Sequence, residues 1–142
     1  MIRIGVCILL LMVMPLLAGF TFLVELRPVA GPLKDEGETV PLKAFFDITK
    51  SGRGKAVLNL SGQERCEGEY ILFEKDQEYT PYFNWSDYQK YYGAKFTPLK
   101  QLQYGQAVLY GDKGTIVEAE FYVNFWRRYG LAKDNNHNVY KL

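Results

Sequence analysis

Apolar and polar residues alternate in two separate stretches of the chain, and each stretch predicts a β-hairpin. The first stretch, residues 54–72, reads GKAVLNLSGQERCEGEYIL, so that two alternating runs flank a Ser-Gly turn. In its second run Cys66 and Tyr70 share one face, and Glu67 lies on the opposite face. The second stretch, residues 105–123, reads GQAVLYGDKGTIVEAEFYV and has the same layout. We therefore expect two antiparallel hairpins.

The two stretches align with each other over both strands, with one gap in the turn. Each has the order Gly-x-Ala-Val-Leu, a Gly turn, and Glu-small-Glu-aromatic, and the C-terminal GLAKDNNHNVYKL is a shorter third echo. We interpret this as an internal repeat. Cys66 falls opposite Val117 in the alignment, which predicts a buried position for the thiol. The aligned residues are Gly54, Ala56, Val57 and Leu58 with Gly105, Ala107, Val108 and Leu109, and Glu67, Gly68, Glu69, Tyr70, Ile71 and Leu72 with Glu118, Ala119, Glu120, Phe121, Tyr122 and Val123.

The repeat resembles the MORN-type hairpin, in which Gly-x-Gly, a short strand, an Asp/Ser-Gly turn and Glu-Gly-Glu-aromatic follow one another. The second copy departs from this pattern because Ala119 replaces the internal glycine. The layout is also similar to that of small exported bacterial proteins of unknown function, which place such hairpins behind a signal sequence. The resemblance implies a structural or interaction surface and no catalytic activity. It is carried by Gly52, Gly54, Gly62, Glu67, Gly68, Glu69 and Tyr70.

The N-terminal segment differs in kind, because Ile4 to Val24 is 21 residues without a charge. Such a run is long enough to cross a bilayer and is apolar on all sides. We expect a signal-anchor or signal-peptide helix over residues 1–25, with membrane contact through residues 4–24. A lipoprotein signal is disfavoured because Phe20 stands where the lipid-bearing cysteine is required. The expected location is the inner membrane, single-pass, with the C-terminal domain in the periplasm or exterior; cleavage and a secreted or periplasmic product remain the alternative.

The predicted fold class is mainly β, an N-terminal transmembrane or signal helix followed by a small antiparallel domain of repeated hairpins with one short inserted helix. Residues 26–41, rich in proline and glycine, read as a linker, and residues 42–142 as the hairpin repeat domain. Between the hairpins NWSDYQKYYG predicts the helix, since Asn84 or Ser86 can cap it and Gly93 can end it.

Charge and composition exclude several functions. With 17 Lys and Arg against 16 Asp and Glu, nothing calls for a nucleic-acid partner. His137, in a turn-like DNNHN, is the one histidine, so neither a nucleophile–base pair nor a zinc site is indicated. The paired carboxylates Glu67/Glu69 and Glu118/Glu120 are interpreted as exposed acidic residues on the solvent face of a sheet. We expect no enzyme, no catalytic, cofactor or metal site, and no cofactor.

The aromatic residues between the two hairpins are the remaining candidate for function. They either cover an open face of the sheet and complete its core or form an exposed platform for a partner. We expect a non-enzymatic, membrane-tethered or exported module that acts as a protein-interaction or structural component of the cell envelope. The alternative is a glycan or cell-wall binding module that uses the aromatic insertion. The candidate binding surface is Tyr82, Trp85, Tyr88, Tyr91 and Tyr92.

Overall fold

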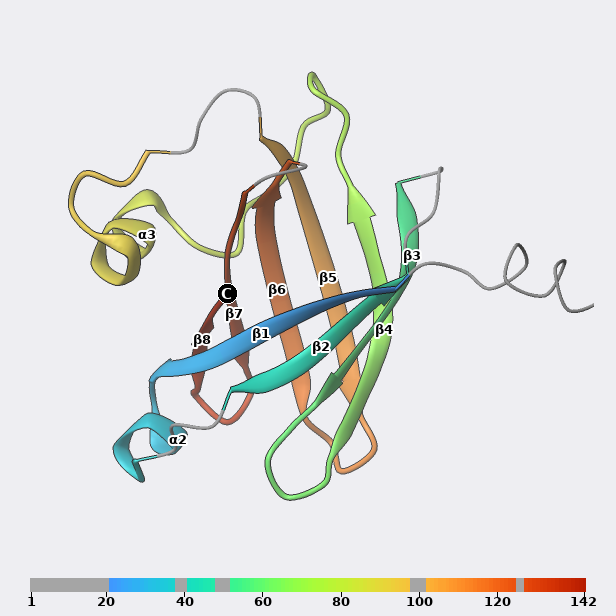
Figure 1. The fold of residues 1–142 in the computed structure, drawn as a ribbon, viewed down its shortest axis with the longest axis vertical. Coiled ribbons are helices and arrows are strands. Elements are labelled where there is room, and N and C mark those ends of the chain that lie inside the picture. Colours follow the sequence, from blue (N-terminus) through green and yellow to red (C-terminus); the bar gives the residue numbers. More distant parts are fainter. Residues whose placement is uncertain (1–20, 38–40, 48–51, 98–101, 125–126) are drawn as a thin grey trace, which may run out of the picture.

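A closed antiparallel barrel is formed by eight strands, each paired with the next in sequence and the last with the first (Figure 1). The computed structural model describes residues 21–37, 41–47, 52–97, 102–124 and 127–142. The strands are β1 (Thr21–Ala30), β2 (Leu42–Asp47), β3 (Arg53–Asn59), β4 (Arg65–Leu72), β5 (Gln103–Gly111), β6 (Ile116–Val123), β7 (Arg128–Asp134) and β8 (Val139–Lys141).

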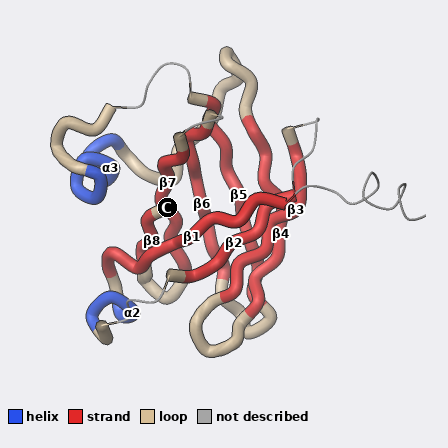
Figure 2. The backbone as a smooth tube through the Cα atoms, viewed as in Figure 1, coloured by secondary structure: helices blue, strands red, loops and turns tan. Residues whose placement is uncertain are grey.

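In the described part of the chain, two helices lie outside the barrel (Figure 2). The first, α2 (Pro32–Asp35), is one turn between β1 and β2. The second, α3 (Trp85–Tyr92), is the inserted helix that the sequence predicts. The Asn84 side chain accepts a hydrogen bond from the Asp87 backbone N–H, and the Asp87 carboxylate accepts one from the Asn84 backbone N–H, which is a capping box. The mainly antiparallel β fold with a short inserted helix is therefore confirmed.

The first strand occupies residues that the sequence analysis assigned elsewhere. β1 takes Thr21–Val24 from the end of the apolar run and residues 26–30 from the expected linker. Its side chains alternate, with Leu26 buried and its neighbours Glu25 and Arg27 more exposed, so it fits one wall of a barrel. Pro28 is tolerated because the β1–β8 register shifts immediately after it. The barrel thus begins before the expected domain boundary at Leu42.

The expected N-terminal helix lies, for residues 1–20, outside the described part of the chain. The same holds for residues 38–40 of the expected linker. Among the residues that the structure does describe, no helix has the length and apolar character needed to cross a bilayer.

The two aligned stretches form the hairpins β3–β4 and β5–β6, and their strands pair in the same register. Leu58 lies opposite Cys66 in the first hairpin, as Leu109 lies opposite Val117 in the second. Cys66 is fully buried in the barrel core, as the alignment predicts. The echo at the C-terminus is the hairpin β7–β8, and β4 also pairs with β5, so that all three hairpins are contiguous in the wall.

Glycine in these strands makes room for an aromatic ring from the opposite strand. Gly54 pairs with Tyr70 and Gly105 with Phe121. A Cβ on Gly54 would lie 2.7 Å from Cε1 of the Tyr70 ring, and a Cβ on Gly105 would lie 2.6 Å from Cζ of the Phe121 ring and closer still to its Cε2. The Gly-to-aromatic spacing of the repeat therefore describes a packing unit, in which each ring lies across the backbone of its partner glycine.

Candidate functional site

One end of the barrel is closed by a network of polar side chains beneath the hairpin turns. Glu64, next to the β3–β4 turn, accepts hydrogen bonds from the backbone N–H groups of Lys113 (2.8 Å) and Thr115 (3.1 Å), and from the Thr115 hydroxyl. Burial alone would raise the pKa of the Glu64 carboxyl, but these hydrogen bonds outweigh burial, and the pKa lies below its usual value. The carboxylate therefore fastens one hairpin turn to the next.

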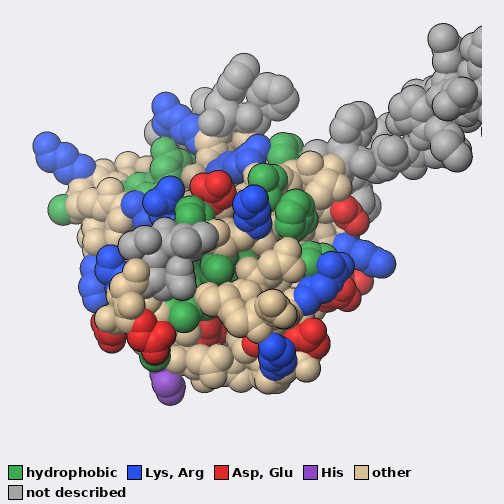
Figure 3. Space-filling view, turned by 60° about the horizontal axis from the view of Figure 1, so that its bottom comes forward, with side chains coloured by type: hydrophobic (Ala, Val, Ile, Leu, Met, Phe, Trp, Pro, Cys, Tyr) green, Lys and Arg blue, Asp and Glu red, His purple; other side chains and the backbone are tan. Residues whose placement is uncertain are grey.

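Asp134 organises the neighbouring β7–β8 turn. One of its carboxylate oxygens accepts from the Asn136 and Asn138 backbones, both at 2.9 Å, and the other accepts from the Tyr140 hydroxyl at 2.6 Å. His137, within this turn, is exposed, as the sequence predicts. Figure 3 brings the closed end forward and shows the histidine protruding from a face on which charges of both signs are intermixed.

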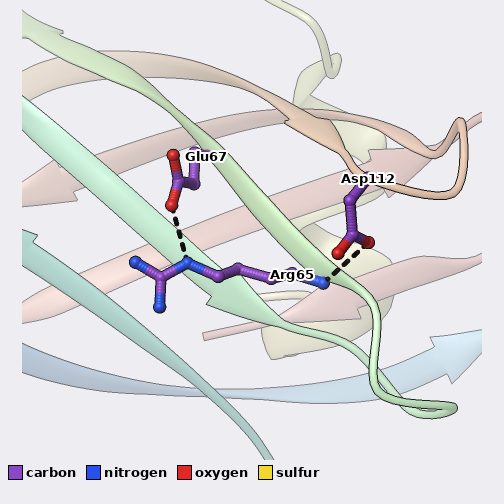
Figure 4. Close-up of polar contacts among 3 residues, drawn as sticks. All are labelled: Arg65, Glu67 and Asp112. Carbon is purple, nitrogen blue, oxygen red and sulfur yellow. Dashed lines mark hydrogen bonds and ion pairs between the residues drawn. The ribbon is translucent and has the colours of Figure 1, made fainter.

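Cys66 lies beside this network, within reach of its carboxylates. Burial, and then the negative charges of Glu64, Asp112 and Asp134, raise the pKa of its thiol to about 11. A buried, protonated thiol is a core residue and a poor nucleophile. Nearby, Arg65 pairs with Glu67 through Nε and Oε1 at 2.6 Å, and its backbone N–H donates to Asp112 (Figure 4). This exposed ion pair contributes little to stability. Within the described residues no group of three or more His, Cys, Asp or Glu is placed to hold a metal.

The aromatic segment between the hairpins packs against the outside of the barrel. Tyr88 is only 1% exposed and lies with its ring centroid 5.5 Å from that of Tyr122 on β6. Tyr92 contacts Tyr129 on β7, and Tyr79 stacks on Tyr104 on β5 at 3.8 Å. These rings form an outer aromatic layer, a second core between the insertion and strands β5, β6 and β7.

Glu120 of β6 holds this layer in place. Its carboxylate is fully buried and accepts from the backbones of Tyr82 (3.0 Å) and Phe83 (3.1 Å) and from the hydroxyls of Tyr88 (3.1 Å) and Tyr104. Each carboxylate oxygen thus accepts two hydrogen bonds. The interpretation of Glu120 as a solvent-facing carboxylate is wrong, because the inserted segment covers it.

The expected binding-surface residues are divided by this packing. Tyr88 lies inside the aromatic layer, and Tyr82, Tyr91 and Tyr92 are half-buried. Trp85 is 36% exposed and stacks on Tyr88 and Phe96. The structure brings most of these rings together as packing partners, which matches the core-completing reading of the segment. Whether the exposed part of this set binds anything stays a prediction.

The opposite end of the barrel contains a pocket, which we call the mouth pocket. Its volume is about 170 Å³, and eight of its ten lining side chains are aliphatic or aromatic. The hydroxyl of Tyr70, one of these, donates to the Asp47 carbonyl and is not directed to a ligand. The polar exceptions are Asn124 and Arg128. The lining residues are Phe22, Val24, Phe46, Tyr70, Leu72, Phe121, Val123, Asn124, Arg128 and Leu142.

The mouth pocket lies beside a seam in the barrel wall. Strand β8 has three residues and pairs with β1 only at Arg27, Pro28 and Ala30. The earlier residues of β1, Thr21–Leu26, pair with β2 alone in the described part of the chain. Across the seam, the Arg128 guanidinium lies 4.5 Å from the centroid of the Phe22 ring. The two strands therefore meet here through side chains.

A smaller void lies deeper in the barrel. It has a volume of about 20 Å³ and shares Val24, Phe46, Phe121 and Leu142 with the mouth pocket. Alanines at positions 44, 119 and 132 line it. The void thus continues the mouth pocket into the barrel interior.

The mouth pocket could not be predicted from the sequence, because its lining comes from strands that are far apart in the chain. One of these strands, β1, begins within the expected membrane segment. The available signal was the alternation in FLVEL at residues 22–26. Comparison with known proteins gave no match to a family model, to a curated protein or to a solved structure.

Proposed function

We propose that this protein is a non-enzymatic binding protein that holds a small apolar group in the mouth pocket. The observation that carries the proposal is the apolar lining of the pocket at the mouth of the barrel. Eight-stranded barrels have an interior that is either filled by side chains or just wide enough for one small ligand. An apolar cavity of about 150 Å³ is known to accept benzene, so 170 Å³ suits a ring or a short alkyl group.

The chemistry of the lining supports binding over catalysis. None of the ten lining side chains is a carboxylate, an imidazole or a thiol. The groups that do carry perturbed pKa values, Cys66 and Glu64 among them, belong to the closed end or the aromatic layer. A site that lacks an acid or base beside its pocket favours a carrier or a sensor.

The proposed setting is the cell envelope. The apolar run of residues 4–20 directly precedes β1, and β1 starts at the rim of the mouth pocket with Phe22. Tethering through this run would place the pocket mouth close to a bilayer. An envelope protein that docks on the exposed surface is compatible with the same setting.

Methyl NMR on the full chain, carried in lipid nanodiscs, tests the proposal with 1-octanol as the probe. We expect saturable shifts of the methyl signals of Val24, Leu72 and Val123, and none for Leu131, which is buried outside the pocket lining. Val123→Trp fills the mouth and should abolish the shifts. Ile116→Trp, on the exposed opposite end of the same strand, is the matched control. Equal responses in both variants would reject the pocket as the site.

Glycan binding is the second candidate, favoured by a shallow groove on the outer face of β4 and β5. Tyr82 and Tyr110 line this groove together with Glu69 and Gln106. Tyr110 is the most exposed large hydrophobic side chain in the described residues, and aromatic faces suit sugar rings. Retention on polysaccharide resin that is lost in Tyr110→Ala and kept in Val123→Trp would support this candidate instead.

A further inference from the structure

We propose that the natural ligand of the mouth pocket is an anionic amphiphile, with its alkyl end in the pocket and its negatively charged head on Arg128. This inference rests on the proposed function, because it names the class of ligand for the same pocket. Arg128 is the first residue of β7, is exposed, and is the one charged side chain in the pocket lining. The charge therefore lies at the rim, where the head of a ligand with a buried tail would emerge.

The position of the guanidinium leaves its donors available. Arg128 lies over the ring of Phe22, a side chain that is itself 44% exposed. Within the described residues the Arg128 guanidinium makes an aromatic contact and no ion pair. The N–H edge of a guanidinium matches a carboxylate or phosphate with two parallel hydrogen bonds. The aromatic contact also restrains the long side chain, which lowers the entropy lost when an anion binds.

No carboxylate of the described residues competes for this guanidinium within 4.0 Å, and the ion pair found in that part of the chain is Arg65–Glu67. Asp47, at the end of β2, accepts a hydrogen bond from the Thr21 hydroxyl at 3.4 Å, and its carbonyl accepts from Tyr70. Arg128 thus carries a positive charge beside an apolar pocket, and no anion of the described residues lies within 4.0 Å to neutralise it. An external anion is the complementary group.

Asn124, the other polar lining residue, has a structural role. Its side-chain oxygen accepts from the Arg127 backbone N–H at 2.7 Å, and the backbone N–H of Asn124 donates to the Arg127 carbonyl at 3.0 Å. These bonds join the residue after β6 to the residue before Arg128. Arg127, its neighbour, is exposed and does not line the pocket.

The size of the pocket limits the tail. About 170 Å³ accommodates roughly the space of a benzene ring, which corresponds to a short alkyl chain or to the terminal part of a longer one. The seam between β1 and β7 lets the rest of a longer molecule leave the barrel sideways, beside Arg128. A medium-chain carboxylate and a short-chain phosphate share this chemistry, and the experiment separates them.

The test compares probes that have the same eight-carbon tail and different heads: octanoate, octyl phosphate and the uncharged 1-octanol. Titrations followed by methyl NMR use the full chain in nanodiscs, with Arg128→Gln and with Arg127→Gln as the matched control. We expect Arg128→Gln to weaken octanoate or octyl phosphate by about 10-fold relative to 1-octanol, as the loss of a charge-assisted hydrogen bond implies. Arg127→Gln should leave that ratio unchanged. Comparing ratios between variants cancels the partitioning of each probe into the lipid.

Each outcome decides a separate point. If octanoate alone responds to Arg128→Gln, the head is a carboxylate; if octyl phosphate alone responds, it is a phosphate. If 1-octanol binds and neither anion gains from Arg128, the anionic-head inference is overturned while the apolar pocket stands. If none of the three probes binds, both the inference and the proposed function fail. An unchanged methyl spectrum of Leu131 in each variant shows that the barrel is folded.

Discussion

Glu120 anchors the aromatic layer, a role that the pattern of paired carboxylates in the sequence does not reveal. Its counterpart in the other hairpin is Glu69, at the same register position and on the same outer face of the barrel. Glu69 is exposed, whereas Glu120 is fully buried under the aromatic layer. The same residue type in the same repeat position is therefore a surface group in one copy and an anchor in the other.

Glu120→Gln should destabilise the protein. The amide keeps one acceptor oxygen and replaces the other with a donor, so that two of the four donors to this side chain, from Tyr82, Phe83, Tyr88 and Tyr104, lose their acceptor. We expect the free energy of unfolding, measured by urea denaturation, to fall by about 2 kcal/mol. Glu69→Gln is the matched control and should change it by less than about 0.5 kcal/mol. Similar losses in both variants would contradict the anchoring role.

Residue positions could be predicted from the sequence where the strand period alone decides them. Cys66 was expected in the core because it alternates with Glu67 and aligns with Val117. The barrel interior buries it without help from any inserted segment. Glu120 could not be placed this way, because alternation gives the face of a strand and not what lies on that face. Its burial depends on a segment that starts some 40 residues earlier in the chain.

The hairpin is the element in which the repeat has physical meaning. In both copies a ring from the second strand lies over a glycine of the first, Tyr70 over Gly54 and Phe121 over Gly105. Phe46 packs edge-on against both rings, at 5.6 Å from Tyr70 and 5.8 Å from Phe121. The glycine–aromatic pairs thus build the aromatic part of the mouth-pocket lining.

Gly105→Ala should destabilise the protein through its contact with the Phe121 ring. The new Cβ would collide with the Phe121 ring and lie 2.9 Å from Leu72 Cδ2, so the ring must move. We expect a loss of about 2 kcal/mol in the free energy of unfolding, the usual cost of overpacking. In a Phe121→Leu background the same substitution should cost at least about 1 kcal/mol less, because the obstructing ring is gone. Additive losses in the double-mutant cycle would contradict the pairing.

Elements differed in how well the sequence defined them. The bounds of α3 follow from its own capping residues, since Asn84 and Gly93 mark the two ends locally. β1 was missed because its first residues continue an apolar run and its later ones include Pro28. In this segment the apolar composition favoured a membrane helix over the strand that the alternation indicated. The pairing with β2 and β8 makes the segment a strand.

Closure of the barrel belongs to the whole molecule and could not be read from local patterns. β1 and β8 pair across more than 100 residues of sequence, through a register that a bulge interrupts. The mouth pocket exists only because this closure is partial, with a short β8 that leaves the start of β1 facing β7. A hairpin repeat predicts neighbouring strands, and it does not state whether the last strand meets the first.

Tyrosine burial makes the fold as a whole sensitive to alkaline pH. Burial is the main cause that raises the pKa of Tyr92 to about 12, and it raises the pKa values of Tyr88, Tyr104, Tyr122 and Tyr140 as well. In the unfolded chain a tyrosine titrates near about 10. Because the folded values are higher, the neutral rings stabilise the fold fully below pH of about 10, and this contribution is lost as the pH rises through about 10 and beyond.

Urea denaturation as a function of pH measures this effect. We expect the free energy of unfolding to fall gently from about pH 8.5, where the Cys66 thiol begins to ionise in the unfolded chain only. It should fall steeply above about pH 10, because several tyrosines gain a charge only on unfolding. Tyr92→Phe should lower the stability at neutral pH, since the hydroxyl accepts from the Gly130 backbone and donates to the Leu142 carbonyl at 2.9 Å. The same variant should reduce the slope above pH of about 10, because one of the linked protons is removed. A slope that Tyr92→Phe leaves unchanged would contradict the view that the aromatic layer is a buried core. A free energy of unfolding that stays level to about pH 12 would contradict it as well.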